Sequence, residues 1–514
     1  MAVTEEILRR PPAREPAART YPQALPIVPV RARGLTIEGA DGRRYLDCLS
    51  GAGTLALGHN HPVVLEAIHK VLDSGAPLTV PDLTTPVEEA FVTELLRTLP
   101  AGLRDRARVR FCGPAPTDAV AAAHTLVRAA TGGTEILGFA GSGCVIGADV
   151  TEAPDPQEAC GTDRLTGLPD LTDRPLLYPQ DYRCPFGVGG PHGAELAARW
   201  AEAALDGGGA DAPSPAGMIL EPVHDAGGVI PAPDTWMRRM RQITAARSIP
   251  LIVDESQTGV GRTGAFWAVE HSGVTPDVMI LSKAIGGSLP LAVVVHRDDL
   301  LDPDEPASAT GLFRGNQLAM AAGAATLAHV RQHRLAERAA TLGYRLLGQL
   351  RELAGEFPCV GEVRGRGLMI GVELVDPAAD SDRLPDEPGS GPAQGSGAAG
   401  LLLPHGPGRD VTRTTTGPYT ARPPRPPAPR LATAVQRECL RRGLIVGAGG
   451  GHPSVVRLLP PLTISDEQAD AVLDRLADAL TAVARDHCGP HIPRPPHPPR
   501  PRRHRPDHPD DPAR

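Results

Sequence analysis

The chain has 514 residues and a formal net charge of −8, and it is 41% hydrophobic and 22% charged. This length predicts one very large domain or two to three ordinary ones, and no apolar run reaches the roughly 20 residues of a membrane helix. The eight cysteines show no CxxC or other metal spacing, so we expect no metal, no disulfide scaffold and a cytoplasmic location. The acidic charge and the lack of a basic helix argue against nucleic-acid binding.

The basic residues are distributed unevenly between the two types. Of the 52, only Lys70 and Lys283 are lysines, and all the others are arginines. Lys283 lies next to an apolar run and is followed by Ala284 and Ile285. A lysine amine can lower its pKa and form a Schiff base, whereas a guanidinium cannot. The composition therefore marks Lys283 as a candidate reactive amine.

In chain order, short strands are expected between Ile27 and Leu46. An amphipathic helix follows over His61–Asp73, with Val64, Ile68 and Val71–Leu72 on its packed side. Residues 108–330 alternate short apolar runs with helical segments, which predicts an α/β fold with a doubly wound parallel sheet covered on both faces. The expected strands are Val109–Cys112, Ile136–Phe139, Gly217–Pro222, Pro250–Asp254, Val278–Leu281 and Leu291–Val295.

The C-terminal part is expected to alternate between ordered and disordered segments. A long helix and a Gly-rich hairpin, Val360–Val375, precede a Pro/Gly/Ser/Ala/Thr-rich stretch, 377–429, which is predicted to be disordered. Order resumes at Leu431 with a helix, and the last helix opens with the capping box Ser465–Gln468. The two strands between these helices are expected over Leu444–Val446 and Val455–Leu459.

Four of the expected strands end in residues that carry chemistry, at the sheet edge where α/β proteins bind ligands. The first runs through Gly113–Asp118 into an Ala-rich helix, a pattern that suits a phosphate at the helix N-terminus. The others end at Glu221, Asp254 and Lys283. Singly, Asp254 also fits a turn or a helix cap, and Lys283 fits a surface lysine. Together, a phosphate site, a carboxylate for a ring nitrogen and an amine for an aldehyde predict pyridoxal phosphate.

Six motifs extend this pattern along the chain: Phe111–Pro114, Leu220–Val223, Asp254–Gly264, Leu281–Gly287, Phe313–Leu318 and Arg457–Leu462. With them the sequence closely resembles the class III (ω-amino acid) pyridoxal phosphate aminotransferases of fold type I. The resemblance covers about residues 20–376 and 430–486. Within the family, the chain is most similar to the diaminobutyrate–2-oxoglutarate aminotransferases.

The resemblance implies a role for each candidate residue. Lys283 would form the internal aldimine and act as the general base, and Asp254 would keep the pyridine nitrogen protonated. Arg457 matches the arginine that grips the substrate α-carboxylate, for which its forked guanidinium is suited. The further implied cofactor contacts are Gln257 at the ring oxygen, Thr117 at the phosphate, and Glu221.

The implied activity is transfer of the amino group of L-glutamate to L-aspartate 4-semialdehyde, giving L-2,4-diaminobutyrate and 2-oxoglutarate by a ping-pong mechanism. An ω-aminotransferase for ornithine or 4-aminobutyrate is the related alternative. The resemblance also implies a homodimer acting on small amino and oxo acids. The expected division is a disordered N-terminus 1–20, small-domain segments 21–75, 331–376 and 430–487, a large cofactor-binding domain 76–330, a disordered insertion 377–429 and a disordered tail 488–514.

Four positions depart from the family pattern. Pro116 replaces a glycine of the phosphate loop, and Gly143-Cys144-Val145 replaces an aromatic-His-Gly motif that stacks on the cofactor. Ala226 stands where a glutamate pairs with the substrate arginine. Asp225, one position away, is a candidate substitute for that glutamate, but its side chain would start from the other face if the segment is extended. Leu312 replaces a threonine that reaches the partner's phosphate. These changes predict weaker cofactor binding, and the alternative function is an impaired paralogue acting as a non-catalytic partner.

Overall fold

The computed structural model describes residues 25, 27–80, 83–141, 175–207, 214–300, 314–379, 424–450 and 453–487. The disorder expected for 1–20 and 488–514, and for most of 377–429, concerns residues outside these ranges. Gly143-Cys144-Val145 and Leu312 also lie outside them. Within the described residues the strands form a six-stranded central sheet, a four-stranded N-terminal sheet, a four-stranded C-terminal sheet and a two-stranded ribbon.

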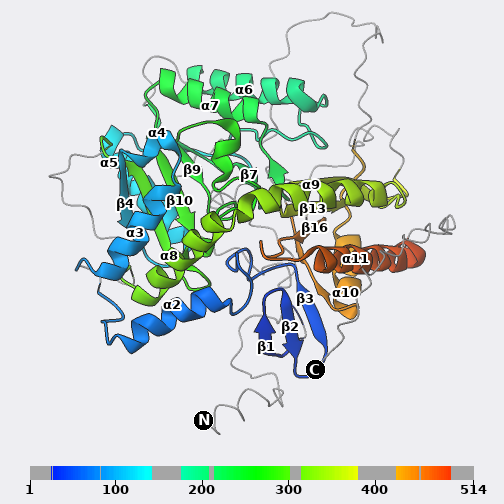
Figure 1. Cartoon of the computed structure of the whole chain (residues 1–514). Coiled ribbons are helices and arrows are strands. Elements are labelled where there is room, and N and C mark those ends of the chain that lie inside the picture. The colour runs from blue at the N-terminus through cyan, green and yellow to red at the C-terminus, as the bar shows by residue number, and fades with distance from the viewer. Residues whose placement is uncertain are drawn as a thin grey trace, which may run out of the picture.

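The central sheet has the strand order β4-β11-β10-β9-β6-β5 (Figure 1). All six expected strands are present, and the sheet is mostly parallel, as expected for the large domain of this fold; the exception is β11, which runs antiparallel to both β10 and β4. Only residues 283–291 join β10 to β11, fewer than the dozen or so that a parallel crossover needs. The strands are β4 (Ala107–Phe111), β5 (Ile136–Leu137), β6 (Gly217–Leu220), β9 (Leu251–Asp254), β10 (Val278–Ser282) and β11 (Ala292–Arg297).

Helices cover both faces of the central sheet, as the sequence predicts. On β9, Ile252 packs with the apolar residues of α5, whereas Leu251 and Val253 pack with those of α3, α7 and α8. Each strand is therefore apolar on both faces, which explains the continuous apolar runs in the sequence. The helices around this sheet are α3 (Pro86–Thr98), α4 (Ala101–Arg104), α5 (Pro116–Thr131), α6 (Gly190–Asp206), α7 (Asp234–Ala246) and α8 (Gln317–Gln332), with the 3₁₀ turns η1 (Ala268–Ser272) and η2 (Lys283–Gly286).

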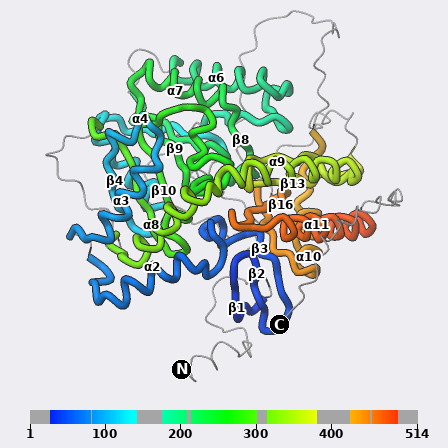
Figure 2. The backbone as a smooth tube through the Cα atoms, viewed as in Figure 1, coloured from blue at the N-terminus to red at the C-terminus, as the bar shows by residue number. Residues whose placement is uncertain are grey.

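The two ends of the described chain meet in the smaller sheets (Figure 2). The N-terminal sheet has the order β1-β2-β3-β14, in which β14 adds parallel to β3. The C-terminal sheet has the order β12-β13-β16-β15 and carries Arg457. The strands are β1 (Pro29–Arg33), β2 (Thr36–Gly39), β3 (Arg44–Asp47), β12 (Val360–Arg366), β13 (Met369–Leu374), β14 (Leu444–Ile445), β15 (Gly447–Gly449) and β16 (Val455–Leu458), and the ribbon pairs β7 (Val223–His224) with β8 (Ile230–Pro231).

The remaining helices are α2 (Pro62–Asp73), α9 (Leu335–Ala354), α10 (Pro429–Arg441) and α11 (Asp466–His487). The α11 capping box is confirmed, because Ser465 and Gln468 exchange side chain to backbone hydrogen bonds of 3.0 and 3.2 Å. The expectation for α2 is wrong at Leu72, which is 47% exposed while Val71 is buried. Helix α10 begins two residues before the expected Leu431.

No helix in the described part of the chain is both long and apolar enough to cross a membrane. The same residues contain no group of three or more His, Cys, Asp or Glu side chains arranged to hold a metal ion.

Candidate active site

The carboxyl edge of the central sheet brings Asp254 and Lys283 together. Strands β9 and β10 are parallel, and Asp254 lies opposite Ile280, so Lys283 begins just beyond the same edge. The Lys283 backbone has a φ of +56°, a left-handed conformation that is uncommon for a side-chain-bearing residue and concentrates at functional sites. The Lys283 Nζ donates a hydrogen bond to the Gln257 Oε1. Asp254, Lys283 and Gln257, three of the predicted site residues, thus lie together at the carboxyl edge of the central sheet.

Asp254 is only 8% exposed, and its Oδ1 accepts a hydrogen bond of 2.8 Å from the backbone N–H of Ser256. The hydroxyls of Ser256, two residues after Asp254, and of Ser282, directly before Lys283, are buried and have no hydrogen-bond partner among the described residues. Neither serine is among the site residues that the sequence predicts. Buried hydroxyls without a protein partner are costly, so an ordered water or a bound molecule would complete their hydrogen bonding.

Gly53 lets the N-terminal segment approach this site closely. Its φ is +93°, and a Cβ there would lie 3.0 Å from the Gln257 Nε2. A larger residue at position 53 would therefore press on the amide that contacts Lys283.

The predicted phosphate loop becomes the start of α5. Pro116 is the first residue of the helix, where the N–H has no partner within the helix and proline is favoured. The substitution therefore removes at most one donor and keeps the helix end. Thr117 follows as the second residue, and Asp118 Oδ2 accepts a hydrogen bond of 3.0 Å from the Ala115 N–H. The first turn of α5 still offers backbone donors to an anion.

Arg457 makes an ion pair with Asp225, with 3.0 Å between Nη1 and Oδ2. On an extended segment the Asp225 side chain would start from the face opposite to this contact. Residues 225–228 instead form a turn between β7 and β8, closed by a 2.9 Å hydrogen bond from the Gly228 N–H to the Asp225 carbonyl. The guanidinium lies over β15, where a Cβ on Gly449 would come within 2.8 Å of the Arg457 Cζ.

Glu221, at the end of β6, supports the same turn. Its Oε2 accepts a hydrogen bond of 3.1 Å from the Asp225 N–H, and its carbonyl accepts one of 2.7 Å from the Tyr178 hydroxyl. The Tyr178 ring stacks on His224, with 4.5 Å between centroids. The predicted contact of Glu221 with the cofactor stays a prediction.

Burial shifts three ionisable groups near this edge. It lowers the pKa of His224 to about 4 and that of Arg262 to about 10, although the nearby Asp225 opposes both shifts. Burial also raises the pKa of Glu255 to about 7, although hydrogen bonds from Thr258 and from the backbone oppose that shift. At neutral pH His224 is therefore uncharged, and Arg262 keeps its charge and donates to the Pro460 carbonyl at 2.8 Å.

These residues fit the cofactor that the sequence predicts. Lys283 provides an amine, Asp254 a buried carboxylate, α5 a helix N-terminus and Ser256 and Ser282 unused hydroxyls. An aldehyde, a ring nitrogen and a phosphate each find a matching group at this edge. The segments predicted to stack on the ring and to reach a partner's phosphate lie outside the described residues.

Comparison with known proteins shows the family of this chain. The family model described as aminotransferase class-III matches residues 17–480. A protein of Rhizobium meliloti (strain 1021) named diaminobutyrate–2-oxoglutarate aminotransferase is 46% identical, over 93% of each chain. A Haemophilus influenzae protein of the same name is 37% identical, over 94% of this chain and 97% of its own. An amine transaminase structure from an uncultivated Pseudomonas species, bound to pyridoxal phosphate, superposes with a TM-score of 0.72 at 25% identity, over 92% of this chain and 99% of its own.

Proposed function

We propose, because the chain belongs to the class III aminotransferase family, that it uses pyridoxal 5'-phosphate to transfer the amino group of L-glutamate to L-aspartate 4-semialdehyde. The products are L-2,4-diaminobutyrate and 2-oxoglutarate. The observation that carries the proposal is the contact of Lys283 with Gln257 beside Asp254, in a chain with only two lysines. The relatives named diaminobutyrate–2-oxoglutarate aminotransferase support the choice of substrates.

On this proposal the bound cofactor supplies an aldehyde for the amino group and a ring that withdraws electrons from the carbon bearing it. The Lys283 Nζ would hold the aldehyde and would carry the proton at the substrate Cα. The Asp254 carboxylate would stabilise the positive charge on the ring nitrogen. The Thr117 hydroxyl and the first turn of α5 would hold the phosphate, and the Gln257 amide would orient the ring oxygen.

The ion pair between Arg457 and Asp225 serves the two substrates differently. L-glutamate presents its α-carboxylate next to the reacting carbon, and a bidentate guanidinium is suited to bind it in place of Asp225. The semialdehyde presents an aldehyde carbon without a carboxylate on it. Asp225 then returns to Arg457 and neutralises a charge that would otherwise be unpaired.

The test is an absorption spectrum of the full chain with pyridoxal phosphate, before and after adding L-glutamate. Wild type should give a near-visible band that is lost in Lys283→Ala and that shifts to shorter wavelength with glutamate. Lys70→Ala is the matched control, because Lys70 is the other lysine and is an exposed residue paired with Glu66 at 2.7 Å. Borohydride reduction followed by mass spectrometry should place the label on Lys283 and not on Lys70.

The spectrum also decides between the proposal and the impaired paralogue. A wild-type protein without the band would contradict the proposal that the chain is an active aminotransferase and would favour a non-catalytic partner. If the band forms, product analysis with L-aspartate 4-semialdehyde tests the acceptor. Faster turnover with the semialdehydes that correspond to ornithine or 4-aminobutyrate would replace diaminobutyrate formation with the related ω-aminotransferase activity.

The proposed assembly is a homodimer. Four exposed leucines along α2 and the chain after it support it, because soluble monomers expose few such neighbours. Size-exclusion chromatography with light scattering should give twice the chain mass, and Leu72→Asp with Leu83→Asp should reduce it. Tyr344→Asp on α9 is the control, because Tyr344 is 83% exposed. The leucines are Leu65, Leu72, Leu78 and Leu83.

The proposed compartment is the cytoplasm. The five cysteines within the described residues, Cys48, Cys112, Cys184, Cys359 and Cys439, are free thiols, which suits a reducing environment.

A further inference from the structure

The turn of residues 225–228 is held by side chains from three separate elements. Asp225 pairs with Arg457 on β16, and its N–H donates to Glu221 at the end of β6. At the other end of the turn, the Gly228 carbonyl accepts a hydrogen bond of 2.9 Å from the Arg364 Nε on β12. The conformation that brings Asp225 to Arg457 therefore depends on anchors at both ends.

Arg364 is itself fixed in place. Its side chain is 11% exposed, and its Nη1 forms ion pairs with Glu362, at 2.6 Å, and with Glu373. The Glu373 side chain is 3% exposed, and its other oxygen pairs with Arg183. A guanidinium held by a buried carboxylate has few other rotamers, so its Nε stays directed at Gly228.

The residues around Gly228 show what the hydrogen bond from the Arg364 Nε contributes. Gly228 has a φ of +102°, and a Cβ there would lie 2.9 Å from the Arg364 Nη2 and 2.8 Å from the Val455 Cγ2. The turn also borders a cavity of about 270 Å³, lined by residues that include Gly227, His224 and Arg364. Gly228 is buried, whereas residues 225–227 are half-buried, so this part of the turn has room to move once the hydrogen bond from Arg364 is lost.

We propose that Arg364 is a positioning residue that sets the strength of the Asp225–Arg457 ion pair through the Gly228 carbonyl. It thereby sets how strongly the enzyme prefers an amino donor with a carboxylate over one without. The specificity part of this inference rests on the proposed function. When the turn is loosened, Asp225 competes less well for Arg457, which favours binding of donors that carry a carboxylate. With donors that lack a carboxylate, the positive charge of Arg457 is then left without a partner.

The positioning is tested by backbone hydrogen exchange of the full chain, read in the peptide that covers residues 221–229. The Asp225 and Gly228 amides should exchange about tenfold faster in Arg364→Gln, a factor typical of losing a hydrogen bond to a charged group. Arg364→Lys keeps a charge for Glu373 but loses the Nε, so it should show the same acceleration. It replaces the glutamine variant if that variant does not fold. Arg366→Gln is the matched control, since Arg366 lies on the same strand and pairs with Asp234 at 3.0 Å.

Equal exchange in wild type and the Arg364 variants would overturn the positioning role, and so would equal acceleration in Arg366→Gln. This readout needs no turnover, so it stands apart from the proposed function.

The specificity is tested with the cofactor-loaded enzyme and two donors, L-glutamate and butylamine. The ratio of their kcat/KM values should rise several-fold in Arg364→Lys and in Asp225→Asn. Because Arg364 acts through Asp225, the double variant should match Asp225→Asn alone. Additive effects, or an unchanged ratio in Arg364→Lys, would overturn the specificity role. A wild type that does not use glutamate would overturn the proposed function and the specificity role together.

Discussion

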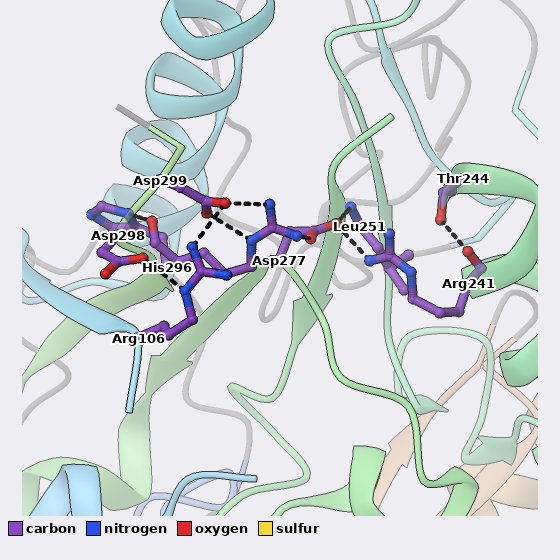
Figure 3. A network of polar contacts seen from close by, with 9 residues as sticks. Arg106, Arg241, Thr244, Leu251, Asp277, His296, Asp298 and Asp299 are labelled. Carbon is purple, nitrogen blue, oxygen red and sulfur yellow. Dashed lines mark hydrogen bonds and ion pairs between the residues drawn. The ribbon is translucent and has the colours of Figure 1, made fainter. Parts of the chain in front are cut away.

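The polar residues at the two edges of the central sheet differ in whether their hydrogen bonds are made within the protein. At the carboxyl edge, Lys283 has a left-handed backbone, and the Ser256 and Ser282 hydroxyls are buried without a partner among the described residues. At the amino edge, Asp277 accepts hydrogen bonds of 2.6 Å from Arg241, 2.7 Å from Arg297 and 2.8 Å from the Leu251 N–H (Figure 3).

The amino-edge network continues to the surface. Arg297 also pairs with Asp299, and Arg106 pairs with Asp298 and Asp299. At this edge each of these charged side chains has a partner of opposite sign, although the Asp298 Oδ1 accepts no hydrogen bond; at the carboxyl edge two buried hydroxyls have no partner among the described residues. One edge therefore contributes to stability and the other is suited to binding, and four substitutions test that division.

The largest effect should come from the amino edge. Asp277→Ala removes a buried carboxylate that pairs with the half-buried Arg241 and Arg297 and accepts the Leu251 N–H. It should reduce the free energy of unfolding by about 2–4 kcal/mol, with kcat/KM unchanged at 25 °C. Denaturant unfolding and glutamate kinetics measure both. Arg106→Ala is the control, because its side chain is 55% exposed and should cost less than about 1 kcal/mol. Equal losses in the two variants would contradict the division.

At the carboxyl edge the effect should reverse. Asp254→Asn keeps an oxygen for the Ser256 N–H but loses the charge for the ring nitrogen. The kcat/KM for L-glutamate should fall about 100- to 1000-fold, while the free energy of unfolding of the apo chain changes by less than about 1 kcal/mol. Parallel kinetics and unfolding measure these. A destabilised variant with normal turnover would show that Asp254 is a structural residue.

Glu255, next to Asp254, tests the comparison of the two edges through the pH dependence of the free energy of unfolding. Burial raises the pKa of Glu255 to about 7 from 4.5, so between these values the folded chain keeps a proton that the unfolded chain loses. Its contribution to the free energy of unfolding must then fall as pH rises through this window. Glu255→Gln removes the dependence, so the variant should equal wild type near pH 4 and exceed it by up to about 3 kcal/mol near pH 8. If the free energies of unfolding of wild type and Glu255→Gln differ by the same amount from pH 4 to pH 8, the raised pKa of Glu255 is contradicted.

The smallest effect should come from Gly449→Ala. The new Cβ would lie 2.8 Å from the Arg457 Cζ, so the guanidinium must move, and the KM for L-glutamate should rise about tenfold with little change in stability. Gly348→Ala on α9 is the control, because a Cβ there meets nothing within 4 Å. An unchanged KM in Gly449→Ala would show that Arg457 does not bind the donor.

Much of the fold was predictable because it depends on local patterns. Apolar runs of strand length between helical segments indicated the central sheet, and Ser465 with Gln468 indicated the start of α11. The placement of Asp254 and Lys283 followed as well, because residues that end neighbouring parallel strands must meet at one edge. The predicted domain boundaries stay predictions.

The sequence alone was enough to predict which strands form and which residues stand at their ends, since strand propensity and polarity are read within a few residues. The antiparallel direction of β11, the turn that pairs Asp225 with Arg457 across 232 positions and the contact of Arg364 with Gly228 emerged only in the folded chain. These contacts depend on a turn whose shape comes from distant partners. A contact between such separated residues leaves no periodic signal in the sequence, because its energy exists only once both segments are folded.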